Sequence, residues 1–469
     1  MRWLSFLALA ACSRVTSREY SDAGIDAPPV IHLDARVDAA PPPDAWVTRP
    51  CDAPPTFADG LTPTRVLHVE AGALPGGDGS VAKPFRSIQE AAAVATPGTF
   101  IQLGPGLHAT NQFVADLRGT PQAPIWIGGV YGTFPRIAGG SEGLHLTRPA
   151  YVVIQNLELG GQTMAAINID DGVAHAGDSH HVALTGVYLH DVIGDVSSTC
   201  VRASGIDDFS VRDSIIGRCF IGVDQVGVHR GVVARNLVYG TQIAALRVRG
   251  GSTDVDLRQN RLRDGGNALQ LGGTTPLALF RPAVSSSMPN AEARRVRAFD
   301  NAIYSDIATA ITFDGCIDCL AAHNLVYGEP QGLVSIRQST PSQGDYVFEP
   351  TRNGRVINNA FVWSAGFLVT QVDAAPFTEP STFTFSHNAW FCYDVPSRST
   401  PTLPVSEDGS LVLTFTGYVP DATSYCGGPE QGMAAPLPEI DGTIEGYCRA
   451  DSPYPTIGPQ AYIDVGCGI

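Results

Sequence analysis

Arginine and aspartate recur at alternate positions within short apolar segments in the middle of the chain. Apolar and polar residues alternate in these segments, which is typical of β-strands that bury one face. Arg247 and Arg249 lie on one such strand, and Asp224, Asp314 and Arg337 lie on three others. A guanidinium binds carboxylates through a rigid fork of donors, and carboxylates are ligands for metal ions. The pattern therefore predicts an outward-facing set of side chains that could do chemistry together.

Aligning equivalent strands predicts two outward rows and two inward rows of side chains. The first outward row contains Arg202, Gly222, Arg247, Gln270, Thr312 and Ser335. The second outward row contains Ser204, Asp224, Arg249, Gly272, Asp314, Arg337 and Gln371. The inward rows contain Leu246, Leu269, Ile311 and Val334, and then Val248, Leu271, Phe313 and Ile336. Stacked in register, these strands form a parallel sheet with a polar outer face and an apolar inner face.

A loose repeat of about 23 residues positions these strands, and repeats of this length mark solenoid proteins. Each unit has an apolar strand, a bend residue and a second apolar strand. The bend residues are Asn156, Gly186, Asp213, Asn236, Asn260, Asn301, Asn324, Asn359 and Asn388. Asparagine tolerates the left-handed backbone of a sharp bend, and stacked amides can form a hydrogen-bonded ladder. Leucine-rich repeats share the period, but their leucine spacing and helical half are missing, so the repeat predicts the coils of a parallel β-helix.

The segment before the repeat predicts a strand, a short helix and another strand. RVLHVEAG reads as the first strand, and residues 100–103 read as the second. Between them, Ser87 can cap a helix that Pro97 and Gly98 bring to an end.

This segment resembles the amino-terminal cap of right-handed parallel β-helix proteins of the pectate-lyase superfamily, in which a short helix plugs the coil stack. From about Pro84 to Asn388 the chain is also similar to a family of bacterial secreted β-helix repeat proteins related to pectate lyases. That resemblance lies in NALQLGGTTPLALFRP, GCIDCLAAHNLVYG and RNGRVINNAFVW. It implies an all-β chain, a right-handed parallel β-helix (solenoid) with a short N-terminal capping helix. The family has no settled reaction, so the resemblance implies a fold more than a function.

In the pectate-lyase superfamily, polysaccharides lie along the outer face of the coils. Acidic residues there hold calcium, which neutralises a uronate, and an arginine or lysine removes the proton next to the carboxylate before β-elimination. Carried over to this chain, the resemblance implies calcium ligands at Asp224 and Asp314. It implies catalytic bases or carboxylate contacts at Arg247, Arg249 and Arg337. It implies further substrate contacts at Arg202, Gln270 and Ser335.

Other interpretations of the same residues remain open. Arginine and aspartate on neighbouring strands also pair simply as surface ions, and calcium sites usually gather several carboxylates, which form no cluster here. A hydrolase would instead need two carboxylates at a suitable separation, such as Asp224 with Asp314 or Asp264. The sequence thus predicts a protein that binds a polysaccharide and, as a lyase or hydrolase, could also cleave it. The alternative is a noncatalytic structural or adhesion module.

The overall charge excludes one class of partner. The chain has 46 acidic and 30 basic residues, a formal net charge of −16, which does not suit nonspecific binding to nucleic acid. An anionic glycan would need a local basic patch. Lys83 is the sole lysine and lies in the amino-terminal segment, so lysine is a poor candidate for a catalytic base.

The first residues, MRWLSFLALAAC, follow the grammar of a signal peptide. The tetrapeptide that ends at Cys12 resembles the lipobox of bacterial lipoproteins, which implies cleavage before Cys12 and a lipid on its sulfur. Ser13 follows it, and the absence of Asp at this position favours the outer membrane or cell surface. The segments are then predicted as signal peptide 1–12, disordered Asp/Ala/Pro spacer 13–60, β-helix 61–395 and loop-rich C-terminal cap 396–469.

An exported chain has access to disulfides, and nine cysteines remain once Cys12 is set aside, so one thiol stays unpaired. Cys200 and Cys219 fall at similar places on successive coils and could cross-link them. Cys316 and Cys319 have the CxxC spacing, but no second pair accompanies them, so a disulfide or buried thiols are favoured over zinc. The cysteines of the C-terminal cap, which would staple it, are Cys426, Cys448 and Cys467.

Overall fold

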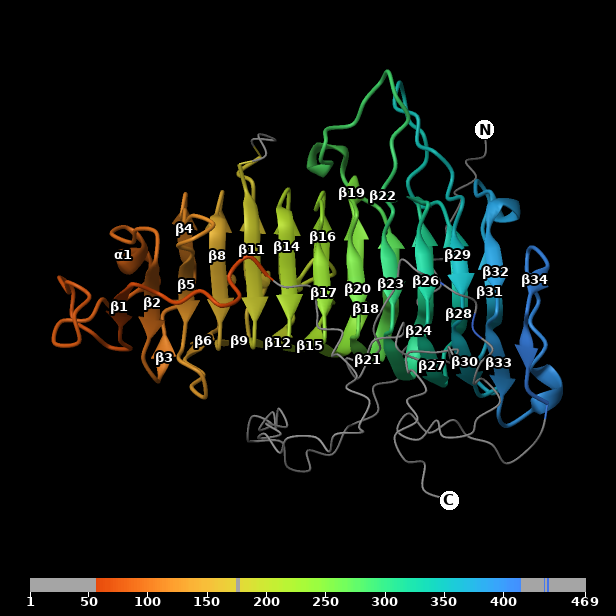
Figure 1. Ribbon diagram of the computed structural model, residues 1–469, viewed down its shortest axis with the longest axis horizontal. Coiled ribbons are helices and arrows are strands. Elements are labelled where there is room, and N and C mark those ends of the chain that lie inside the picture. Colours follow the sequence, from red (N-terminus) through yellow and green to blue (C-terminus); the bar gives the residue numbers. More distant parts are fainter. Residues whose placement is uncertain (1–55, 174–177, 415–433, 435–436, 438–469) are drawn as a thin grey trace, which may run out of the picture. The chain divides into compact units, whose positions relative to one another are not determined.

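The computed structural model describes residues 56–173, 178–414, 434 and 437, and all of these belong to one compact unit that spans residues 48–469 (Figure 1). The signal peptide with Cys12, the spacer up to residue 55 and most of the C-terminal cap lie outside the described residues. Cys426, Cys448 and Cys467 are among those outside. No helix of the described part is long and apolar enough to cross a bilayer.

The described strands pair in parallel, coil on coil, and form the right-handed parallel β-helix that the sequence predicts. A first sheet holds 13 of the described strands. In spatial order they are β1 (Arg65–Val69), β2 (Thr99–Leu103), β5 (Ile125–Gly128), β8 (Ala150–Gln155), β11 (His180–Thr185), β14 (Asp207–Arg212), β17 (Val232–Ala234), β20 (Asp256–Arg258), β23 (Arg297–Phe299), β26 (Leu320–Ala322), β29 (Arg355–Ile357), β32 (Thr384–Ser386) and β34 (Glu407–Asp408).

A larger sheet divides at a bend into two parts, here called the second and third sheets. The second sheet contains β3 (Leu107–His108), β6 (Arg136–Ala138), β9 (Glu158–Gly160), β12 (Tyr188–Val192), β15 (Ile215–Cys219), β27 (Leu325–Gly328), β30 (Ala360–Trp363), β33 (Ala389–Cys392) and β35 (Leu411–Val412). The third sheet contains β4 (Gln112–Ala115), β7 (Glu142–Thr147), β10 (Ala165–Asp170), β13 (Thr199–Ser204), β16 (Ile221–Val226), β28 (Gly332–Arg337) and β31 (Thr370–Ala374). Three long strands run through both parts: β18 (Leu237–Arg249), β21 (Arg261–Gly272) and β24 (Ala302–Asp314).

Short elements complete the described part. A small sheet holds β19 (Ser252–Thr253), β22 (Ala293–Arg294) and β25 (Cys316–Ile317), and the 3-10 turns are η1 (Leu277–Leu279), η2 (Pro380–Thr382) and η3 (Pro396–Arg398). The predicted helix is α1 (Ile88–Ala92), and the Ser87 hydroxyl caps it by accepting from the Glu90 backbone N–H at 3.2 Å. Ile88 and Ala91 of this helix are buried in the main core at the β1 end of the stack.

Two predicted boundaries differ from the structure. Residues 56–60, assigned to the spacer, include Phe57 and Ala58, which pack with Leu61 against Phe100 and Trp126 on the first sheet. At the other end, β34 pairs with β32 and β35 pairs with β33, so the coils continue beyond residue 395 as far as Val412.

The core is the stack of inward side chains, and the two inward rows are as predicted. Leu246, Leu269, Ile311 and Val334 stand in register and are fully buried, as are Val248, Leu271, Phe313 and Ile336. Burying one such side chain stabilises the fold by roughly 1.5–3 kcal/mol, so each coil depends on contact with its neighbours.

An asparagine ladder lines the bend between the first and second sheets, as predicted. The backbone and side-chain N–H groups of each asparagine donate to the side-chain oxygen of the next, at 2.9 to 3.1 Å. The members are Asn236, Asn260, Asn301, Asn324, Asn359 and Asn388, and the last donates to Glu407. The ladder therefore satisfies buried backbone donors that water cannot reach.

The prediction that the ladder asparagines themselves adopt the left-handed backbone of the bend is wrong. The left-handed backbone belongs to the residue before each ladder asparagine, such as Arg235 with φ 58° and Asp300 with φ 56°. On the earlier coils the left-handed residues that align with Arg235 are Asn156, Gly186 and Asp213. The predicted ladder positions on these three coils are therefore one residue too early. On the third of those coils Ser214 takes the ladder position, and its N–H donates to Asn236 at 3.0 Å.

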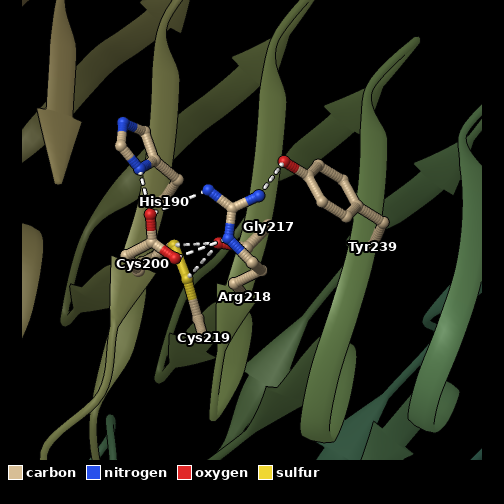
Figure 2. The surroundings of a disulfide bond; sticks show 7 residues. His190, Cys200, Gly217, Arg218, Cys219 and Tyr239 are labelled. Carbon is tan, nitrogen blue, oxygen red and sulfur yellow. Dashed lines mark hydrogen bonds and ion pairs between the residues drawn. A yellow bond between two sulfur atoms is a disulfide. The ribbon is translucent and has the colours of Figure 1, made fainter. Parts of the chain in front are cut away.

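Two disulfides lie in the described part. Cys200 on β13 is bonded to Cys219 at the end of β15, which confirms the predicted cross-link between coils, and Figure 2 shows it beside His190, Arg218 and Tyr239. Cys316 is bonded to Cys319, so the CxxC pair is a disulfide. Cys392 is a buried free thiol.

Candidate functional site

The outer face of the third sheet gathers all the residues for which the sequence predicts catalysis, substrate contact or calcium binding. In the structure its first row is Phe113, His145, Asn168, Arg202, Asp224, Arg247, Gln270, Thr312, Ser335 and Asp373. The second row includes Asp170, Ser204, Val226 and Arg249, and it continues through Gly272, Asp314 and Arg337.

Three places in the predicted rows are wrong. Asp224 lies in the first row, between Arg202 and Arg247, and Val226 takes its predicted place beside Arg249. Gly222 lies two residues before the row. Gln371, predicted to follow Arg337 in the second row, aligns instead with Leu333, and Asp373 pairs with Ser335 in the first row. A shift of two residues along β16 keeps the same residues on the outer face of the strand. The alternation in the sequence therefore cannot distinguish the predicted register from the observed one.

Asp224 forms the centre of a buried ion cluster. Arg247 donates to its two oxygens at 2.8 and 3.0 Å, and Arg249 donates to the same oxygens at 3.0 and 2.8 Å. The Asp224 side chain is 0% exposed. Burial alone would raise the pKa of Asp224, but the two guanidinium groups outweigh it and hold the pKa well below its usual value.

This cluster does not fit two of the predicted roles. Both oxygens of Asp224 already accept from two guanidinium groups, which leaves no room for a cation at either oxygen. Burial alone would lower the pKa of Arg249, but Asp224 raises it above its ordinary value, so Arg249 stays protonated and cannot act as a base. Arg247 shares the same carboxylate. The alternative interpretation, that arginine and aspartate pair across the sheet, describes this cluster.

Asp314 and Asp264 do not form a carboxylate pair with Asp224. Asp314 accepts hydrogen bonds from the backbone N–H and the hydroxyl of Ser339, both at 2.7 Å, and burial raises its pKa despite these donors. Three strand spacings separate β16 from β24, and Asp314 lies two residues beyond the position that aligns with Asp224, so the Cα atoms of Asp314 and Asp224 are about 16 Å apart. Asp264 lies at the bend between the second and third sheets, beside Arg263. The described residues contain no group of three or more His, Cys, Asp or Glu placed to hold a metal ion, so they do not fit the predicted calcium.

The remaining predicted residues lie between and beside this cluster. Arg337 donates to the Ser335 hydroxyl at 2.6 Å, and Arg202 donates to the Ser197 backbone carbonyl. Among the ion pairs of the described residues, neither guanidinium has a carboxylate partner. Gln270 and Thr312 stand next to each other in the row, and the side-chain oxygen of each is buried without a hydrogen-bond partner in the described part.

Two loops border this face at the β18 to β28 strands (Figure 1). The buried carboxylate of Glu292 ties them together. Residues 273–292 and 338–354 pair where the Asn290 N–H donates to the Val347 carbonyl at 2.8 Å. Glu292 is fully buried and accepts from Thr275 at 2.6 Å and from Thr340 at 2.5 Å. Burial raises the pKa of Glu292, although these donors oppose the shift. Thr274 and Thr275 in turn accept from Arg249, so the loops fix one edge of the arginine cluster.

A second polar cluster on the same face escaped the sequence analysis. His145 Nδ1 lies 2.8 Å from Glu142 and Nε2 lies 2.7 Å from Asp170. Hydrogen bonds to Asp170 and Glu142 raise the pKa of His145 to about 9. Asn168 donates to the other Glu142 oxygen at 2.8 Å. No motif marks these residues, because β7 and β10 supply them from positions 23 or more residues apart. The signal in the sequence was the pair of outward polar residues in each strand, His145 and Thr147 in EGLHLT and Asn168 and Asp170 in AAINID.

His190, on β12 of the second sheet, also has carboxylate neighbours. Its ring lies 2.6 Å from Asp191 and 3.3 Å from Glu158, and Asp191 also accepts from Arg218. Arg218 in turn donates to the Tyr239 hydroxyl at 3.1 Å (Figure 2). These contacts lie on the second sheet, away from the predicted rows.

Comparisons with known proteins place the fold. No protein-family model matches the chain, and no curated protein matches it. Among solved structures, the pectate lyase Pel9A superposes with a TM-score of 0.54 at 14% identity, over 86% of this chain and 98% of that one. The chain has a pectate-lyase-like fold. An alginate lyase from Paenibacillus sp. str. FPU-7 (TM-score 0.40, 16% identity, 67% of this chain and 97% of that one) and a rhamnogalacturonan lyase (0.44, 10%, 72% and 90%) are also similar. At these identities the likeness establishes the fold alone.

The Asp224 cluster makes a prediction about stability. Asp224→Asn leaves two guanidinium groups without their buried counter-charge, so we expect the free energy of unfolding in urea to fall by about 3–5 kcal/mol. Asp116→Asn is the matched control, because Asp116 pairs with Arg148 at 2.7 Å on the surface and its loss should change stability little. Equal stabilities of Asp224→Asn and the wild type would contradict the assigned ion cluster.

His145 makes a prediction about pH. Its pKa is raised from 6.5 to about 9 in the folded state, so its contribution to stability is complete below pH 6.5 and is lost as the pH rises through about 9. We expect the difference in unfolding free energy between wild type and His145→Gln to shrink over this range. His68→Gln is the control, since the described residues provide His68 with no carboxylate partner. A difference that stays constant from pH 6.5 upwards would show that His145 is not held protonated by Glu142 and Asp170.

Proposed function

We propose that this protein binds an anionic extracellular polysaccharide along the outer face of the third sheet. One observation carries the proposal: Arg202 and Arg337 lie on this face without a carboxylate partner among the ion pairs of the described residues, in a chain whose formal net charge is −16. The guanidinium groups are those of Arg202, Arg247, Arg249 and Arg337. The carboxylates on and beside these strands are those of Asp224, Asp314, Glu292 and Asp373, and burial raises the pKas of Asp314 and Glu292.

The chemistry of the face suits a uronate chain. Arginine binds carboxylates through two parallel hydrogen bonds, and Arg202 and Arg337 retain donors for this purpose. Between them, the side-chain oxygens of Gln270 and Thr312 have no hydrogen-bond partner in the described part of the chain, at a cost of about 1–3 kcal/mol per buried group. Strands about 4.8 Å apart also repeat the binding groups along one line, as a polymeric ligand requires.

The structural comparison supports the same class of ligand. Pel9A, which superposes with a TM-score of 0.54, is named a pectate lyase, and pectate is an anionic polysaccharide. At 14% identity this support is by analogy of fold.

Binding is better supported than cleavage. Elimination needs a cation or equivalent charge at the uronate carboxylate and a base within reach of the adjacent proton. Among the predicted bases, Arg247 and Arg249 are held by Asp224, which leaves Arg337 beside Ser335 as the remaining candidate. The competing function is the noncatalytic structural or adhesion module.

Binding can be tested by retention in affinity gels that contain a polyuronate. We expect Arg202→Ala and Arg337→Ala each to weaken retention, by about tenfold in Kd if each arginine contributes one charge-assisted contact. Arg261→Ala is the matched control, since Arg261 is exposed on the outer face of the second sheet and should leave retention unchanged.

The same preparation distinguishes the two functions. Cleavage would be established if the wild type forms unsaturated products, detected by their absorbance, and Arg337→Ala does not form them. Retention without products would establish binding alone. A wild-type protein that no polyuronate retains would contradict the proposal and leave the structural module.

We also infer that the chain is exported and anchored by a lipid on Cys12, with the outer membrane or cell surface as its destination. The lipobox-like sequence before Cys12 and the serine after it support this inference. The two disulfides support an oxidising compartment, because cytosolic thiols are kept reduced.

Anchoring predicts a difference in detergent partitioning. The wild type expressed in a bacterial host should enter the detergent phase, and Cys12→Ser, which lacks the acylated sulfur, should stay in the aqueous phase. Identical partitioning of the two proteins would contradict the anchor without bearing on glycan binding.

A further inference from the structure

The outer face of the third sheet changes character toward its β4 end. There the first row carries Phe113, His145 and Asn168, one strand after another, before it reaches Arg202. Glu142 precedes the row on β7, and Asp170 belongs to the second row on β10. These residues are neighbours of the proposed uronate-binding groups, but they differ from them in charge and chemistry.

The net charge at this end is negative. Hydrogen bonds to Asp170 and Glu142 keep the pKa of His145 at about 9, so its ring is cationic at neutral pH. Burial would raise the pKa of Glu142 and of Asp170, but His145 lowers both, so both are anionic. One positive and two negative groups leave the cluster itself with one negative charge, and Arg202, which follows Asn168 in the row, acts on Glu142 from outside the cluster. A uronate carboxylate would be repelled here, whereas an uncharged sugar would not.

The cluster also presents groups that suit a sugar ring. Phe113 is 49% exposed at the start of the third sheet, and its ring meets His145 edge to face at a centroid distance of 5.5 Å. Asp170 remains 26% exposed and offers acceptor oxygens. Asn168 is only 9% exposed, and its side-chain oxygen has no hydrogen-bond partner in the described part of the chain. An apolar ring beside a part-exposed carboxylate and one amide oxygen without a partner among the described residues matches the C–H face and the hydroxyl edge of a sugar.

We propose that Phe113, Asp170 and Asn168 form a subsite for an uncharged sugar ring, with His145 and Glu142 as positioning residues. The proposal rests on the proposed function and narrows its substrate class. Six strand spacings separate Phe113 on β4 from Gln270 on β21, about 29 Å, so one glycan chain must be several sugars long to span both. The ligand is then a heteropolysaccharide that carries both neutral and acidic sugars, rather than a polyuronate alone.

The test compares three oligosaccharides by isothermal titration calorimetry: an acidic homo-oligomer, a mixed oligomer with neutral sugars at one end, and a neutral oligomer. The mixed oligomer should bind about tenfold more tightly than the acidic one, a difference of about 1.4 kcal/mol. Phe113→Ala should abolish that difference and leave the Kd of the acidic oligomer unchanged. Phe134→Ala is the matched control, because Phe134 is an exposed phenylalanine outside the third sheet.

The outcomes separate this proposal from the proposed function. Equal affinities for the mixed and acidic oligomers, or a preference that survives Phe113→Ala, would overturn the subsite while the acidic site stands. If the acidic oligomer does not bind, the proposed function fails, and the neutral oligomer alone then tests the subsite. If the neutral oligomer binds to the wild type but not to Phe113→Ala, the subsite is supported. If the neutral oligomer does not bind to the wild type, the subsite is overturned.

Discussion

Parallel hydrogen bonding from coil to coil is the constraint on which the rest of this structure depends. Each strand pairs with the equivalent strands of the coils before and after it. Every side chain is therefore stacked between its counterparts on those coils, at a spacing of about 4.8 Å. The inward rows then become a continuous apolar core, and the outward rows become lines of polar groups. The asparagine ladder holds this register at the bend, since each amide bonds both the backbone and the side chain of its neighbour.

The same register explains the chemistry of the third sheet. It brings Asp224 between Arg202 and Arg247, and Arg249 reaches the same carboxylate from the second row. A carboxylate this deeply buried is held ionised only by its two guanidinium partners, which are fixed in return. Among the described residues, Arg202 and Arg337 form no ion pair with a carboxylate, and they flank Gln270 and Thr312, whose side-chain oxygens have no partner there. One outer face thus carries available arginines at the β13 and β28 strands and a carboxylate-rich cluster at the β7 and β10 strands.

Much of the fold could be predicted from the sequence, because it depends on periodic patterns. The inward rows, the ladder positions from Asn236 onwards and the Cys200–Cys219 cross-link follow from apolar alternation and repeat spacing. The candidate site could be predicted only in part. Asp224 was misplaced by two residues because alternation cannot distinguish such a shift. The cluster of Glu142, His145 and Asp170 has no motif, since it exists only when two coils are stacked.

Residue-by-residue arginine modification tests the central claim, a uronate chain on the outer face of the third sheet, most directly. The protein would be treated with phenylglyoxal with and without a saturating uronate oligosaccharide, and each arginine followed by mass spectrometry. The account predicts that the glycan protects Arg202 and Arg337 and leaves Arg136 and Arg261, on the second sheet, as reactive as before. Equal modification of Arg202 and Arg337 with and without glycan, or protection of the second-sheet arginines instead, would contradict it.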